Sequence, residues 1–152
     1  MEPQGRTRFE KGSSYTRRQI HDALGGSARA ALPTRGGKVV CACLTRGRNP
    51  RAPEEMVIDG AERAVKLARA FAASGAAVPV FVRGRRGGWD YTGERRVRAI
   101  VDEPGALLAL VAEGAPADVS LVLLLEEPAD GALGTAGDAS RAASPPAAAP
   151  GA

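Results

Sequence analysis

Apolar residues recur at helical spacing in a segment near the N-terminus. Within residues 17–24, Ile20, Ala23 and Leu24 fall on one face of a helix. Thr16 is placed to cap the start of this helix, and the two glycines that follow Leu24 are placed to end it. The pattern therefore predicts a short amphipathic helix.

A second helix is predicted over residues 62–73, where Val65 and Ala68 share one face and basic residues occupy the other. Asp59 is placed to cap its start, and Gly75 to end it. A third, shorter helix is predicted over residues 106–112.

Strand-like sequence surrounds these helices. Pro79 favours an edge strand or a strand beginning. A turn rich in glycine and arginine, residues 84–88, precedes residues 89–91 and predicts a hairpin. Residues 45–53 form a stiff, basic loop because two prolines forbid regular structure there. The predicted strands are residues 38–44, 78–82, 95–101 and 119–125. Together these elements predict the α+β class, with a mainly β core and flanking helices.

The chain has 152 residues, which is enough for one domain with its own core. Residues 1–13 are interpreted as a flexible arm and residues 14–104 as the main domain. Residues 105–127 form an acidic helix-strand extension. Residues 128–152 are mostly Ala, Gly, Pro and Ser with almost no large apolar side chain, so this tail is predicted to be disordered.

No apolar run approaches the roughly 20 residues that a membrane helix needs. The first residues are charged and contain no core of a secretory signal, so we expect a cytoplasmic protein with no membrane partner. Cys41 and Cys43 lie two apart on a predicted strand, where an extended backbone makes a disulfide between them unfavourable. Both are interpreted as small buried apolar groups.

The net charge of +4 conceals a division along the chain. Residues 1–104 carry 20 Lys and Arg against 11 Asp and Glu, a net of +9, whereas residues 105–152 carry 1 against 6, a net of −5. The basic part is therefore the part in which to look for an acidic partner.

The sequence offers little for catalysis. Its single histidine, His21, has no cysteine or carboxylate cluster near it, so with two thiols it cannot complete a four-ligand zinc site. The turn at residues 84–88 lacks the Lys-Ser/Thr ending of a phosphate-binding loop. We therefore expect a chain that is not an enzyme and that has no metal site and no cofactor.

Nucleic-acid binding has more support, because arginines gather in three places along the basic part. If these groups converge on one face, they attract phosphates and make binding strongly dependent on salt. The alternative is a solvated basic surface without a partner. The three groups are Arg17 and Arg18; Arg46, Arg48 and Arg51; and Arg83, Arg85 and Arg86.

Aromatic residues are scarce, and two of the six flank Asp90. Alternation along a strand places Trp89 and Tyr91 on one side and Asp90 on the other. The two rings then either pack in the core or form a stacking wall for an extruded base. In the second case a nearby carboxylate accepts a hydrogen bond from an exocyclic amine.

Five of these motifs, in order over residues 9–104, resemble the SRA-like (SET- and RING-associated) domains joined to HNH nuclease domains in McrA-type modification-dependent restriction endonucleases. The motifs are Tyr15–Ile20 with Gly25-Gly26, Leu32-Pro33 before a Gly-Lys-Val-Val strand, Asn49–Pro53, Val78–Val82 and Trp89–Gly93. The resemblance implies a PUA-like, curved β barrel with two or three flanking helices. It also implies a DNA partner, held by flipping 5-methylcytosine or 5-hydroxymethylcytosine out of the duplex.

The resemblance makes residues 14–104 the DNA-binding domain and identifies two sets of candidate residues. The candidates for the modified-base pocket are Tyr15, Trp89, Asp90 and Tyr91. The candidates for DNA contact are Arg17, Arg18, Arg46, Arg48, Asn49, Arg51, Arg85 and Arg86.

The chain departs from these relatives because no nuclease motif follows the reader. Its cleavage partner is then a separate nuclease subunit, or the reader acts alone. Two other functions stay open: a PUA-like module that binds RNA, and a protein-interaction domain in which the arginines only maintain solubility.

Overall fold

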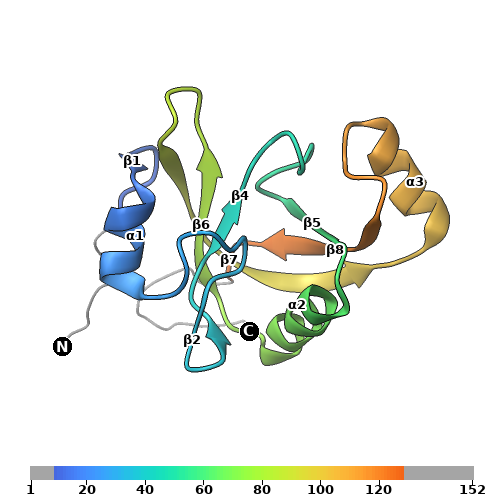
Figure 1. Cartoon of the computed structure of the whole chain (residues 1–152), viewed down its shortest axis with the longest axis horizontal. Helices are drawn as coiled ribbons and strands as arrows, with labels where there is room; N and C mark the ends of the chain where they lie inside the picture. The colour runs from blue at the N-terminus through green and yellow to red at the C-terminus, as the bar shows by residue number, and fades with distance from the viewer. Residues whose placement is uncertain (1–8, 129–152) are drawn as a thin grey trace, which may run out of the picture.

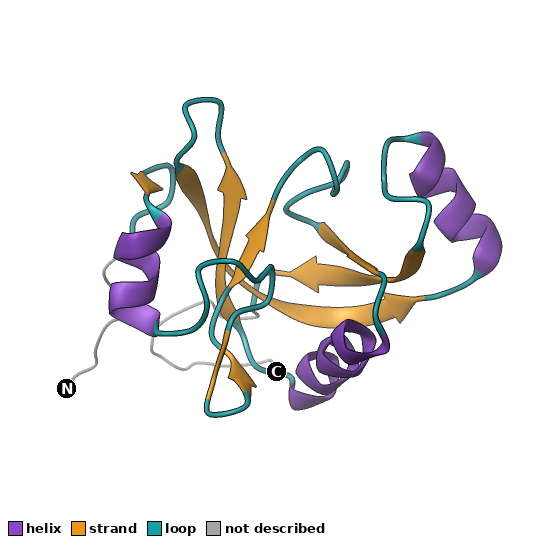
Figure 2. Cartoon of the chain, in the orientation of Figure 1, coloured by secondary structure: helices purple, strands orange, loops and turns teal. Residues whose placement is uncertain are grey.

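The computed structural model describes residues 9–128, which form one curled sheet with three helices on its periphery (Figures 1 and 2). The elements, in chain order, are β1 (Ser14–Tyr15), α1 (Arg17–Leu24), β2 (Thr34–Arg35), β3 (Lys38–Val39), β4 (Ala42–Leu44), β5 (Glu55–Asp59), α2 (Glu62–Ser74), β6 (Val78–Arg83), β7 (Trp89–Val101), α3 (Pro104–Ala112) and β8 (Val119–Glu126).

The main sheet has the strand order β4-β6-β7-β8-β5, with β1 added beside the start of β7, while β2 and β3 pair separately. The pair β4–β6 is parallel and every other pair in the described chain is antiparallel. The long strand β7 pairs with β6 through its first half and with β8 through its second half.

Curvature comes from the middle of β7. Its pairing shifts register opposite Pro79 and again between Val97 and Ala99, and such bulges bend a strand. At the first of these shifts, buried Gly93 has φ +107°, a conformation that side-chain-bearing residues rarely adopt. The sheet therefore curls into a half-barrel (Figure 1).

Two apolar clusters occupy opposite faces of the hairpin β6–β7. Val80 and Val82 belong to the larger cluster, which α2 covers with Ala68 and Phe71. Phe81, between those valines, belongs to the smaller cluster under α1. Because strand side chains alternate, consecutive residues of one buried strand supply both cores. A third cluster lies beneath α3.

The first predicted helix is confirmed together with its cap. Gln19 donates its backbone N–H to Thr16 Oγ1 at 3.0 Å, and the Gln19 side chain accepts from the Thr16 N–H at 2.8 Å. This reciprocal capping box satisfies two N–H groups that a helix start otherwise leaves unpaired. Gly25 ends the helix, as the sequence predicts.

The predicted cap of the second helix is wrong. Helix α2 begins after Ala61, without a side-chain cap. Asp59 belongs to strand β5 and forms an ion pair with Arg48. Strand β5 was not predicted, although buried Met56 and Ile58 alternate along it with less buried neighbours.

The strand predicted over residues 38–44 is two strands, since β3 belongs to a separate small hairpin and only β4 joins the main sheet. Conversely, the strand-like segments 89–91 and 95–101 are parts of the single strand β7. Pro79 lies at the beginning of β6, one of the two positions that the sequence allowed.

Residues 9–13 of the predicted arm are packed against the domain. Phe9 is buried with its ring 5.0 Å from that of Phe81, and Tyr91 exchanges backbone hydrogen bonds with Gly12 and Ser13. At the other end of the chain, β8 lies between β7 and β5, and it contributes to the main core. One core thus spans both sides of the predicted boundary at residue 104. Residues 1–8 and the predicted disordered tail from residue 129 onward lie outside the described chain.

Cys41 and Cys43 are free and buried, as expected, with their sulfur atoms 4.0 Å apart. Their mutual hydrogen bond raises the pKa of Cys41, with help from burial, and lowers the pKa of Cys43. Within residues 9–128, no helix is long and apolar enough to cross a membrane.

Candidate nucleic-acid interface

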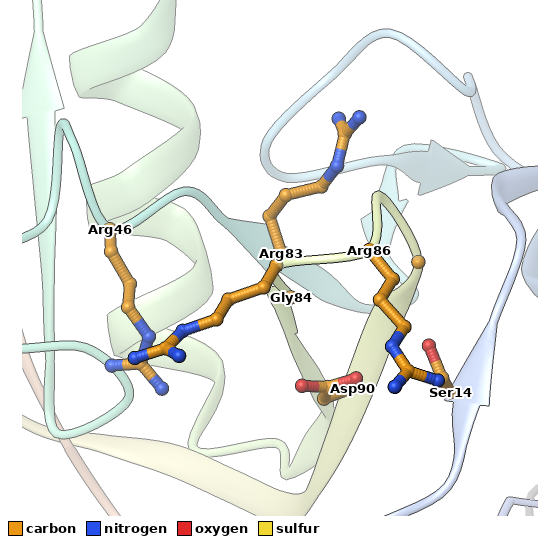
Figure 3. A pocket seen from close by; sticks show the side chains of 8 residues that line it. Ser14, Arg46, Arg83, Gly84, Arg86 and Asp90 are labelled. Atoms are coloured by element: carbon orange, nitrogen blue, oxygen red, sulfur yellow. The ribbon is translucent and has the colours of Figure 1, made fainter.

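A cavity of about 650 Å³ opens beside the turn that joins β6 to β7 (Figure 3). In this view Asp90 lies between Arg46 on one side and Arg86 with Ser14 on the other. The lining residues come from three separate segments: Ser14, Arg46, Arg83, Gly84, Arg85, Arg86, Gly88 and Asp90.

Strand register brings Ser14 and Asp90 to this cavity. Ser14 pairs with Asp90 across β1 and β7, so the two side chains share a face of the sheet. The next pair, Tyr15 and Trp89, points to the opposite face. Alternation therefore separates the cavity from the aromatic cluster, although both are built on the start of β7.

Two glycines allow the turn to close around Asp90. A Cβ on Gly84 would lie only 2.9 Å from Asp90 Oδ2, so the bare backbone leaves room for the carboxylate. Gly87 has φ +87° and donates its N–H to Gly84 O at 3.2 Å. Gly84 N also donates to Gly88 O at 2.8 Å. We refer to residues 84–88 as the arginine turn.

The charged groups of the cavity are largely unpaired. Within residues 9–128, Asp90 forms no ion pair and its carboxylate accepts no hydrogen bond, and the residue is half-buried. Arg85 and Arg86 are exposed and have no carboxylate partner in the same part of the chain. Arg46 donates one hydrogen bond, to Ala52 O at 3.3 Å. The cavity thus offers several cationic donors and one anionic acceptor to a ligand.

The other arginines of the loop 45–53 are used within the protein. Arg48 forms an ion pair with Asp59. Arg51 makes a two-pronged contact with Glu113, at 3.1 and 2.6 Å, and lies 3.5 Å from Glu55. The hydrogen bonds and charge of Glu113 raise the pKa of Arg51, and Arg51 lowers the pKa of Glu113 in return.

Asn49, a candidate for DNA contact, has a structural role instead. It is only 6% exposed. Its amide nitrogen donates to Thr45 O at 2.9 Å, and its amide oxygen accepts from Val57 N at 2.7 Å. These bonds hold the loop 45–53 against β5, so the amide is not offered to a ligand.

The two arginines of helix α1 have different surroundings. Arg18 is exposed and lies 3.9 Å from Asp22. Arg17 places its guanidinium 4.9 Å from the centre of the Trp89 ring and donates to two backbone carbonyls, those of Ser27 and Ala30. Only Arg18 is therefore free to approach a phosphate.

Of the four base-pocket candidates, Asp90 lines the cavity and the three aromatic residues do not. Trp89 and Tyr91 are each 7% exposed and pack in the cluster under α1, the core alternative that the sequence left open. Burial raises the pKa of Tyr91 to about 12. Tyr15 is half-buried, with its ring 5.0 Å from that of Phe9.

Of the eight DNA-contact candidates, Arg46, Arg85 and Arg86 meet at the cavity. The sequence reasoning did not identify Ser14, Gly84 and Gly88 as part of the site. Only the register of β1 against β7 places Ser14 there, and that register has no local sequence signal. Among residues 9–128, no group of three or more His, Cys, Asp or Glu side chains could hold a metal ion.

An α+β domain with a curled half-barrel sheet, three helices and this basic cavity has the SRA-like fold, which confirms the predicted fold class. The fold matches the crystal structure of the SUVH5 SRA domain in complex with hemi-methylated CG DNA, with a TM-score of 0.54 and 12% identity, over 80% of this chain and 89% of that one.

Two further SUVH5 SRA structures match at a TM-score of 0.53 and 13% identity, each over 80% of this chain and 90% of the other. One contains methylated CHH DNA and the other fully hydroxymethylated CG DNA. No known family matches the sequence. No curated protein matches it either.

Proposed function

We propose that this chain binds duplex DNA that carries 5-methylcytosine or 5-hydroxymethylcytosine, and that it holds the modified base flipped out of the duplex. One observation carries the proposal: four arginines and one carboxylate share a cavity, and none of the five forms an ion pair within residues 9–128. The fold adds support, because the matched SRA structures are complexes with methylated or hydroxymethylated DNA.

The two kinds of charge suit two parts of a nucleotide. Arg85 and Arg86 on the exposed turn are suited to phosphates, which a planar guanidinium binds through paired hydrogen bonds. Asp90 is suited to the exocyclic amine of cytosine, for which a carboxylate is the usual acceptor.

Within residues 9–128, no aromatic side chain lines the cavity, so stacking on a flipped base requires a different group. Arg46 is suited to this role, because a guanidinium plane stacks on bases as an aromatic ring does. Flipping costs a few kcal/mol of lost stacking in the duplex. Contacts from Arg46, Asp90 and the arginine turn offset that cost.

We further propose that the chain is a recognition module and not itself an enzyme, and that it serves a restriction-type system with the nuclease on a separate subunit. The resemblance of residues 9–104 to readers joined to HNH nucleases supports this role. If the chain has this role, we expect a second subunit that cleaves DNA only when this chain is present.

The test compares matched duplexes containing cytosine, 5-methylcytosine or 5-hydroxymethylcytosine, with a duplex RNA of the same sequence, at two salt concentrations. We expect tighter binding to a modified duplex. In Asp90→Ala, we expect affinity for the modified duplex to fall about tenfold, since the hydrogen bond from the exocyclic amine to a charged acceptor is lost. Arg63→Ala is the matched control, because Arg63 is exposed on α2 and outside the cavity.

Equal binding to all the DNA duplexes would contradict the modified-base proposal and leave a basic surface. Preference for RNA would instead favour the RNA-binding function. No binding to any duplex would favour a protein-interaction domain.

A further inference from the structure

Two guanidinium groups lie against Trp89, which stands at the base of the arginine turn. The Arg17 guanidinium is 4.9 Å from the centre of the indole ring, and that of Arg83 is 5.4 Å away. Both distances fall within the range of a cation–π contact. Trp89 and Arg83 are cross-strand partners, at the start of β7 and the end of β6. The contact therefore closes the hairpin immediately below the turn.

Arg17 is held from several directions. Its terminal nitrogen donates to Ser27 O at 3.1 Å and to Ala30 O at 2.8 Å, and its Nε donates to His21 Nε2 at 2.9 Å. Because Nε2 of His21 accepts, its Nδ1 is the nitrogen that carries a proton, and it donates to Gly25 O at 2.8 Å. The helix α1 and the segment after it thus fix where the guanidinium rests on Trp89.

Few interactions within residues 9–128 stabilise the arginine turn above this contact. Three of its five residues are glycine, and its internal backbone hydrogen bonds are those of Gly84 with Gly88 and with Gly87. The side chains of Arg85 and Arg86 contact no carboxylate within residues 9–128. The direction in which the two arginines project is consequently set at the base of the hairpin.

We propose that Trp89 and Arg17 are positioning residues for the arginine turn. By bracing Trp89 against Arg83, Arg17 fixes the base of the hairpin, so less conformational freedom is lost when Arg85 and Arg86 engage phosphates. Neither Trp89 nor Arg17 touches the DNA. This inference rests on the proposed function, and it gives Arg17 a role other than the phosphate contact that its sequence position suggested.

The test uses Arg17→Gln in the full chain. Arg18→Gln, on the same helix, is the control for fluorescence, and Arg63→Gln, exposed on α2 and outside the cavity, is the control for binding. Trp89 is the single tryptophan of the sequence, so its fluorescence reports the contact without DNA. We expect the emission to change in Arg17→Gln and not in Arg18→Gln. We also expect Arg17→Gln to bind a 5-methylcytosine duplex about fivefold more weakly, the size of one lost cation–π contact.

Salt dependence distinguishes positioning from direct contact. A positioning residue leaves the slope of log affinity against log salt unchanged, whereas loss of a phosphate contact lowers that slope by about 1. A lower slope in Arg17→Gln would overturn the inference, and so would unchanged affinity. If Arg17→Gln does not fold, Trp89→Phe replaces it, since phenylalanine keeps a ring in the cluster but weakens the contact.

The two levels of proposal fail in different ways. If the wild-type chain binds no modified duplex preferentially, the proposed function fails. If the wild-type chain binds as proposed and Arg17→Gln binds equally well, only the positioning role fails.

Discussion

The loop 45–53 and the arginine turn look alike in the sequence, since each sets two or three arginines among glycines or prolines. In the structure they differ. The loop has Arg48 paired with Asp59 and Arg51 paired with Glu113, whereas Arg85 and Arg86 of the turn have no carboxylate partner within residues 9–128. The loop is therefore mainly a structural element, and the turn is the surface available to an anion.

The difference depends on which carboxylates lie close to each segment. Strand β5 brings Glu55 and Asp59 to the loop, and the end of α3 brings Glu113, which is 62 residues from Arg51 along the chain. The turn projects from the sheet at the end of a hairpin (Figure 1). Asp90 is the acidic residue that lines the cavity there, and it forms no ion pair within residues 9–128. A cluster of arginines thus indicates a binding surface only where distant carboxylates do not reach it.

Among the substitutions that test the difference between loop and turn, replacement of Asn49, whose buried amide holds the loop, has the largest expected effect on stability. Asn49→Ala leaves the N–H of Val57 without its acceptor and removes one of the three donors to Thr45 O, which costs about 1–3 kcal/mol of unfolding free energy. Urea unfolding measures this loss. Asn49→Asp is the comparison variant, because it keeps the acceptor for Val57 but replaces the donor with a buried charge that repels the Thr45 carbonyl oxygen. A loss below about 0.5 kcal/mol would show that the loop does not depend on Asn49.

Paired arginine substitutions compare the two segments directly. In Arg85→Ala/Arg86→Ala we expect DNA affinity to fall about tenfold or more and the salt slope to fall by about 2, with unchanged unfolding free energy. In Arg48→Ala/Arg51→Ala we expect the salt slope of the wild type, because these charges are already neutralised inside the protein. Fluorescence anisotropy at several salt concentrations gives both slopes. Equal reductions in the two variants would remove the distinction between loop and turn.

The smallest expected effect concerns acid stability. Arg51 holds the pKa of Glu113 below its ordinary value of 4.5. Folding is therefore favoured by this pair above pH 4.5, and the contribution is lost as the pH falls through the lower pKa of the folded protein. The difference in unfolding midpoint between wild type and Arg51→Gln should shrink from pH 7 to pH 3. Because both groups are exposed, added salt should also shrink it. A difference that is independent of pH would assign Arg51 a role in packing.

Features with a local sequence signal were predictable from the amino-acid sequence. Thr16 and Gln19 form a capping box within one turn of chain, so α1 was predictable with its ends. Alternation along β7 was enough to separate Asp90 from Trp89 and Tyr91, because strand geometry decides which side chains share a face. The basic turn between two strands was likewise recognisable from its glycines.

Which charged and polar side chains are free to bind a ligand depends on tertiary contacts that the sequence does not reveal. Asp59 resembled a helix cap, but it lies in β5 and pairs with Arg48. Arg17 was a candidate for phosphate contact, but its guanidinium lies against Trp89, which belongs to β7. Ser14 reaches the cavity through strand register alone. In each case the partner is distant in the sequence, and the energy of an ion pair, a ring contact or a strand pair depends on distance in space.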